Sequence, residues 1–119
     1  MEIVDSDKTK LMDLFEDIKP RIEKVYVSTK DVVYRFTKSI NEKDMRISIT
    51  KCQLEENTKY VGFLRRKKET YTSESRSEYR CIISIHLLNN SVRVFDKLLL
   101  ETVTKWAQSK GFERLIKDF

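Results

Sequence analysis

Cationic side chains recur at alternate positions in the β-like segments of this sequence. In VYRFT the cation lies between Tyr34 and Phe36, and in DMRIS it lies between Met45 and Ile47. Successive side chains of a β-strand point to opposite faces, so this alternation predicts a sheet with an apolar face and a cationic face. The cationic face is predicted to carry Arg35, Arg46, Arg80, His86 and Arg93, interspersed with Thr37, Ser48, Thr50 and Ser84. Guanidinium groups and hydroxyls of this kind can hold phosphates.

Three interpretations of this face stay open at the level of sequence. It is a solvated face that arginine keeps soluble, or it binds phosphate groups, or it is buried against another protein, where arginine is also enriched. No carboxylate occurs at the in-strand positions of the same parity. A protonated His86 beside Arg93 is therefore unfavourable unless a loop acid or a bound anion lies nearby.

A second basic feature follows the segment KYVGFL. It consists of Arg65, Arg66, Lys67 and Lys68. It is either a solvated loop or a segment that follows the backbone of a nucleic acid or an acidic lipid surface. Tyr60 and Tyr71 could stack on bases, but no RNP-like aromatic pattern, KH-type GxxG or zinc-finger spacing is present.

The residues that enzymes use are scarce. The chain has one histidine and two cysteines, Cys52 and Cys81, and it has no nucleophile elbow or cluster of metal ligands. His86 beside Arg93 would stay neutral, yet no partner that would orient it is identifiable. We therefore expect no catalysis and no cofactor. The two cysteines are expected to be reduced thiols, with Cys81 buried on the side of Ile83 and Ile85.

The segment YRCIISIHLLNNSVRVF predicts a β-hairpin. Apolar residues take every second place, with Ile82 as the one departure from the alternation. A type I′ turn with Asn89 and Asn90 at its centre would pair Ile85 with Val94 and His86 with Arg93. Leu87 would then oppose Val92. A slip of one residue would place every apolar side chain on the wrong face.

The remaining elements follow from periodicity and breaker residues. Leu11, Phe15, Ile18 and Ile22 have helical spacing, and Pro20 should end or bend their helix. Trp106 is expected to anchor the last helix in the core, whereas Asp13, Glu16 and Asp17 are expected to be solvated. The expected elements are a helix at about 7–19, strands at 24–28, 32–38, 45–52, 59–66, 79–88 and 91–95, and a helix at 96–110 with a short terminal turn. They predict a single α+β domain over 1–119, a two-layer fold in which both helices cover one face of an antiparallel meander of 5–6 strands.

The net charge is +5, and it is distributed unevenly. Residues 1–23 hold seven acids and four bases, a balance of −3, so residues 24–119 carry +8. Such a surplus favours anionic partners. The N-terminal residues lack the basic and apolar regions of a signal peptide, and no apolar run reaches the length of a membrane span. We expect a soluble intracellular protein of the cytoplasm or nucleus.

These features predict a small, basic, non-enzymatic binding module. The first hypothesis is that it binds nucleic acid, RNA or single strands, or another polyanion. Arg35, Arg46, Arg80, His86 and Arg93 would provide the contacts, helped by residues 65–68. The alternative is a protein–protein adaptor or inhibitor: a homodimer, a small subunit of a complex, or a phage or viral accessory protein. An edge strand, the sheet face or the helices would then form the contact.

Overall fold

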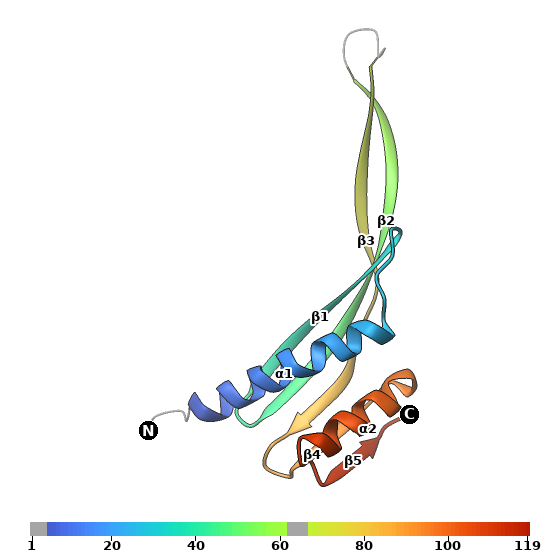
Figure 1. The fold of residues 1–119 in the computed structure, drawn as a ribbon. Coiled ribbons are helices and arrows are strands. Elements are labelled where there is room, and N and C mark those ends of the chain that lie inside the picture. The colour runs from blue at the N-terminus through green and yellow to red at the C-terminus, as the bar shows by residue number, and fades with distance from the viewer. Residues whose placement is uncertain (1–4, 62–66) are drawn as a thin grey trace.

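The protein folds into a five-stranded sheet with two helices on one of its faces (Figure 1). The computed structural model describes the backbone of residues 5–61 and 67–119, and the side chains of residues 7–55 and 74–119. The elements are α1 (Asp5–Val25), β1 (Val32–Asn41), β2 (Asp44–Val61), β3 (Lys67–His86), β4 (Ser91–Val94), the 3-10 helix η2 (Lys97–Leu99), α2 (Leu100–Ser109) and β5 (Arg114–Lys117). The strand order is β1-β2-β3-β4-β5, which confirms the predicted α+β class.

The core lies between the sheet and the two helices. The apolar stripe of α1, which includes Leu11, Phe15 and Ile18, packs against the alternating apolar residues of the central strands. From α2, Val103 and Trp106 complete the cluster. The fully buried strand residues are Met45, Ile47, Ile82, Ile83, Ile85, Val92 and Val94. One sheet face and two helical stripes thus cover each other in two layers.

Helix α1 passes through Pro20 and ends at Val25, so the prediction of an end near residue 19 is wrong. Proline removes one intrahelical hydrogen bond, but the next turn is stabilised because Ile22 is fully buried. The helix is closed by the N–H of Tyr26, which donates to the carbonyl of Ile22 at 2.9 Å. The predicted strand at 24–28 is therefore absent, and Val27 is exposed.

The β2–β3 hairpin is much longer than expected. The strands predicted at 45–52 and 59–66 form one strand of 18 residues as far as Val61, and residues 62–66 lie outside the described part of the chain. Strand β3 has 20 residues and begins at Lys67 instead of at residue 79. Since β1 pairs with β2 only as far as Gln53, the rest of the hairpin extends beyond the body as a two-stranded ribbon (Figure 1). The radius of gyration is 19.5 Å, against about 13.5 Å for a compact chain of this length.

Two register shifts interrupt the β2–β3 pairing. Ile47 pairs with Ile83 and Ser48 with Cys81, so Ile82 is an extra residue in β3. This bulge explains the departure from alternation, because both Ile82 and Ile83 are fully buried. From Glu78 to Cys81 the side chains of β3 therefore face the opposite side from the one that simple alternation predicts. The second shift, between Lys51 and Cys52, leaves Ser77 as the extra residue and restores the alternation from Arg76 towards the start of the strand.

The turn between β3 and β4 has four residues instead of the predicted two. It runs from Leu87 to Asn90, whose N–H donates to the Leu87 carbonyl at 3.3 Å and whose φ is 50°. Ile85 accordingly pairs with Val92 and Ser84 with Arg93, a displacement of two residues from the predicted register. A displacement of two preserves the faces, so the matching of apolar with apolar residues could not distinguish the two registers.

The C-terminal segment forms a strand instead of a helical turn. Gly111, with φ at 82°, ends α2 as predicted, and the following chain returns to the sheet. Strand β5 then pairs with β4 in parallel, as a crossover through α2 allows. Asn90 Nδ2 donates to the Gly111 carbonyl at 3.1 Å, so the turn before β4 is joined to the turn before β5.

The indole of Trp106 is fully buried, which confirms its predicted role, and it has a polar partner on α1. Trp106 Nε1 donates to Asp17 Oδ2 at 2.6 Å, and Lys110 Nζ lies 3.3 Å from the same oxygen. The prediction that Asp17 is only solvated is therefore wrong, whereas Asp13 and Glu16 are exposed. The hydrogen bond from Trp106 lowers the pKa of Asp17, and Lys110 lowers it further.

This pair predicts a pH dependence of stability. Because the pKa of Asp17 is lower in the folded than in the unfolded chain, its charge stabilises the fold above the unfolded pKa, and this contribution is lost as the pH falls through the folded pKa. Asp17→Asn should lower the free energy of unfolding at neutral pH by about 0.5–1 kcal/mol, since Asp17 is more than one-third exposed. Urea denaturation at a series of pH values should also show a weaker loss of stability in acid than for the native chain. The matched variant Asp13→Asn should leave the acid dependence unchanged.

Candidate functional site

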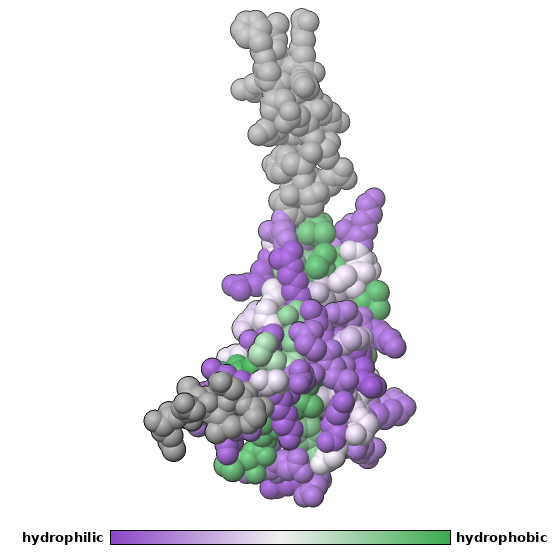
Figure 2. All heavy atoms as spheres, turned by 60° about the vertical axis from the view of Figure 1, so that its left-hand side comes forward, coloured by the Kyte–Doolittle hydropathy of each residue, from purple (hydrophilic) through white to green (hydrophobic). Residues whose placement is uncertain are grey.

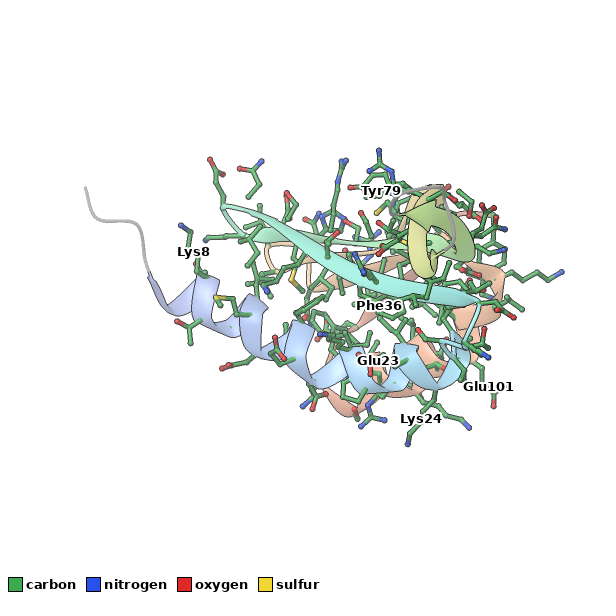
Figure 3. All side chains as sticks on the ribbon, turned by 90° about the horizontal axis from the view of Figure 1, so that it is seen from above. Lys8, Glu23, Lys24, Phe36, Tyr79 and Glu101 are labelled. Atoms are coloured by element: carbon green, nitrogen blue, oxygen red, sulfur yellow. The ribbon has the colours of Figure 1, made fainter. Side chains whose placement is uncertain are left out.

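The face of the sheet turned away from α1 and α2 is not covered by any described element, and we call it the outer face. Figure 3 shows its orientation: Phe36 lies between β1 and α1, whereas Tyr79 lies on the opposite side of the sheet. The pairing register assigns the other positions. Its charged and aromatic residues are Arg35, Asp44, Arg46, Glu74, Arg76, Tyr79, His86, Arg93 and Arg114.

Two adjacent rows of side chains hold three of the five residues predicted for the cationic face. In one row, Ser84 on β3 pairs with Arg46 on β2 and with Arg93 on β4. In the next row, His86 pairs with Asp44 and with Ser91. The structure thus brings Arg46, His86 and Arg93 together as predicted, although His86 and Arg93 lie in neighbouring rows instead of opposite each other.

His86 has two hydrogen-bond partners that orient its ring, contrary to the sequence-based expectation. Nδ1 lies 3.0 Å from Asp44 Oδ1, and Nε2 lies 3.1 Å from Ser84 Oγ. This is the order of groups in a Ser-His-Asp triad. Ser84 is only 3% exposed, however, so its hydroxyl is closed to an approaching substrate. What the arrangement provides is a histidine of fixed orientation next to two arginines.

Carboxylates from outside the predicted strands partly neutralise the arginines, in line with the nearby loop acid that the sequence left open. Arg35 forms a bidentate ion pair with Glu74, in which both N···O distances are 2.9 Å. Arg93 Nη1 lies 3.3 Å from Asp118 Oδ2. Arg46 is exposed and has no ion-pair partner within the described side chains. Glu74 was expected in a loop, and Asp118 lies beyond the last predicted element.

Arg80 lies on the opposite side of the sheet, so its assignment to the cationic face is wrong. Beyond the Ile82 bulge it pairs with Ile49, whose side chain is in the core. Arg80 Nη2 donates to Asp96 Oδ2 and to the hydroxyl of Tyr26, at 2.8 Å in each case. Arg80 Nε also donates to Glu78 Oε1 at 2.7 Å. The guanidinium group of Arg80 is therefore a structural group on the helix side.

The buried carboxylate of Asp96 joins three segments of the chain. Its Oδ1 accepts the Leu98 N–H at 2.9 Å and so caps η2, while its Oδ2 accepts hydrogen bonds from Arg80 and from the Tyr26 hydroxyl. Burial and the hydrogen bond to Asp96 raise the pKa of Tyr26 to about 12, so the hydroxyl stays protonated at neutral pH. The ring of Tyr26 also packs against Tyr34 at a centroid distance of 5.2 Å.

The outer face includes residues that sequence reasoning did not assign to it. Tyr79 was placed with the apolar residues, yet it is 60% exposed, and the guanidinium carbon of Arg76 lies 5.8 Å from its ring centroid. Arg114 on β5 pairs with Ser91, so it lies in the same row as His86. Recognising the Ile82-Ile83 pair as a bulge would have reversed the parity of Tyr79 and Arg80, and this was the signal available in the sequence.

The basic cluster is described only in part. Arg65 and Arg66 lie outside the described residues. Lys67 and Lys68 pair with Val61 and Tyr60 at the far end of the described ribbon, and their side chains are outside the described set.

Both cysteines are free. Cys81 was expected to be buried, but it pairs with Ser48 and is only half-buried, because the bulge moves it out of the core. Cys52 is buried. A hydrogen bond to Glu74 and burial raise the pKa of Cys52, and burial raises that of Cys81. Among the side chains of residues 7–55 and 74–119, no three His, Cys, Asp or Glu gather as a metal site would require. None of the helices in the described part of the chain has the length and apolar composition needed to cross a bilayer.

Comparisons with protein-family models, with curated proteins and with solved structures find no match to this chain.

The different positions of Arg80 and Arg46 predict different mutant stabilities. Arg80→Met should lower the free energy of unfolding by about 2 kcal/mol, because it leaves the 5%-exposed Asp96 with fewer partners. The matched variant Arg46→Met, on the outer face, should change it by less than about 0.5 kcal/mol. Chemical denaturation of both variants checks this, and equal stabilities would contradict the structural role of Arg80.

Proposed function

We propose that this protein binds single-stranded nucleic acid, RNA or DNA, without catalysis, across the outer face of its sheet. The observation that carries the proposal is the row in which Arg46 and Arg93 flank Ser84 on an uncovered face. Guanidinium groups on the two strands that flank β3 can contact the oxygens of one phosphate or of two successive phosphates.

The balance of charge on the outer face supports an anionic partner. Five arginines (Arg35, Arg46, Arg76, Arg93 and Arg114) face three carboxylates (Asp44, Glu74 and Asp118). The ion pairs of Arg35 and Arg93 are exposed, and such pairs contribute only about 0–1 kcal/mol, so exchanging a carboxylate for a phosphate costs little. The sequence adds four cations at residues 65–68, next to the far end of the ribbon.

Tyr79 favours single strands over duplexes. Its exposed ring, with Arg76 beside it, offers a surface on which a base can stack, and such stacking requires an unpaired base. On β2, the positions that pair with Tyr79 and Ser84 are Thr50 and Arg46. Four residues of strand separate them, about 13 Å, which a few nucleotides span.

A protein partner is the second candidate. Strand β1, ten residues long, lies at the edge of the sheet and pairs only with β2 among the described strands, and such edges can accept a strand of another chain. The exposed large hydrophobic residues are spread over several elements, and the surface in Figure 2 is mainly hydrophilic with separate hydrophobic patches. An apolar docking surface is therefore less favoured than an ionic one.

The proposal predicts salt-dependent binding that depends on the outer face. Fluorescence anisotropy with labelled oligo(U) and oligo(dT) of about 12 nucleotides should show affinity that falls steeply between about 50 and 400 mM NaCl. Arg46→Ala/Arg93→Ala should weaken binding at least about tenfold at low salt and reduce the slope of log affinity against log salt by about 1.4. Tyr79→Ala should weaken binding with little change in this slope.

The control is Arg21→Ala/Lys24→Ala, which removes the same charge from the exposed side of α1. It should lower the affinity far less than the outer-face variant. Equal losses in the two double variants would mean that net charge alone attracts the oligonucleotide. Undiminished binding by the outer-face variant would contradict the proposal, and a protein partner retained at high salt would support the second candidate.

A further inference from the structure

His86 lies beside the row that is proposed to hold phosphate, and it is the one histidine of the chain. Its ring connects Asp44, at 3.0 Å from Nδ1, with Ser84, at 3.1 Å from Nε2. Ser84 in turn is the central residue of the row between Arg46 and Arg93. A change in the protonation of His86 is therefore transmitted directly to the hydroxyl at the centre of that row.

In the neutral state the hydrogen bonds have one consistent direction. Nδ1–H donates to Asp44, and Nε2 accepts the hydroxyl proton of Ser84. The charge of Asp44 is not balanced by the imidazole, and it repels an anion bound in the next row.

Protonation of His86 changes this balance of charge. Nε2 becomes a donor, so Ser84 Oγ must accept from it. The imidazolium also neutralises Asp44, with which it forms an ion pair at 3.0 Å. The outer face thus gains one positive charge beside the row that holds Arg46 and Arg93.

We propose that protonation of His86 strengthens the binding of a nucleic-acid phosphate by Arg46 and Arg93. This inference rests on the proposed function and adds proton-dependent regulation to that site. The negative charge of the phosphate offsets the positive charges of the guanidinium groups next to the imidazolium.

The charged groups around His86 come from three neighbouring strands and one turn. β2 contributes Asp44 and Arg46, β4 contributes Arg93, and β5 contributes Arg114 beyond Ser91. Lys43, in the β1–β2 turn, approaches through its backbone, where its carbonyl accepts the Leu87 N–H at 3.0 Å. Asp44 is the one acid among them that contacts the ring. A bound phosphate offsets these cations and so favours the protonated imidazole.

The coupling is reciprocal, which provides two independent measurements. If protons increase the affinity for the oligonucleotide, the oligonucleotide must increase the affinity of His86 for a proton. Histidine is the side chain whose charge ordinarily changes between about pH 5 and pH 8, and a single histidine gives one resolved imidazole signal in a proton NMR titration.

The test measures binding of labelled oligo(U) at constant ionic strength at about pH 8 and about pH 5.5. The native protein should bind about three- to tenfold more tightly at the lower pH, the effect of one charge several ångströms from a phosphate at a partly exposed site. His86→Gln should lose most of this increase, measured as the ratio of its own affinities at the two pH values. Oligo(U) should shift the NMR titration midpoint of His86 upwards.

A second variant tests the role of the carboxylate. Asp44→Asn removes the repelling charge, so it should bind about two- to threefold more tightly than the native chain at about pH 8. Circular dichroism of each variant establishes that it is folded.

The outcomes separate this inference from the proposed function. Salt-dependent binding with the same pH response in His86→Gln and the native chain, or an unmoved NMR midpoint, overturns the inference and leaves the proposed function intact. Absence of oligonucleotide binding at both pH values overturns both.

Discussion

The β-bulge at Ile82 decides which side chains of β3 face the helices and which face solvent. With one extra residue against β2, Ile82 and Ile83 are both buried in the core, and residues 78–81 of β3 change side until the second extra residue, Ser77, restores the parity. Arg80 is moved under the helices, while Tyr79 is moved to the outer face. The composition of both faces therefore depends on a single inserted residue.

On the helix side, the displaced Arg80 has become part of the fold. It reaches Asp96 at the start of η2 and Tyr26 in the link between α1 and β1, so three segments distant in sequence meet at one carboxylate. A carboxylate buried to this extent is stable only when it is paired and hydrogen-bonded. Together with the Trp106–Asp17 hydrogen bond between α2 and α1, this cluster fixes both helices on the same side of the sheet. The outer face remains uncovered as a consequence.

On the outer face, the pairing of the strands aligns polar side chains from different strands in rows. Arg46, Ser84 and Arg93 form one row, and Asp44, His86 and Ser91 form the next, because antiparallel pairing aligns these positions. The acids lie in pairs with particular bases instead of forming a separate patch, so they moderate the attraction for anions without reversing it. The hairpin ribbon beyond Gln53 extends this surface away from the body (Figure 1).

The sequence by itself determined the class of the fold, the buried stripes of both helices and the two-faced character of the strands, because periodicity of apolar residues is a local property. It also placed Arg46, His86 and Arg93 on one face correctly. Only the tertiary structure decided the bulge, the turn of four residues and the continuation of α1 through Pro20, since each depends on burial against a distant element. The strand from Lys67 was missed because its residues are polar and leave no alternation to read, and β5 was missed because a four-residue strand is defined by its partner. Arg80, Glu74 and Asp118 acquired their roles from contacts between residues far apart in the chain, and no local pattern encodes such contacts.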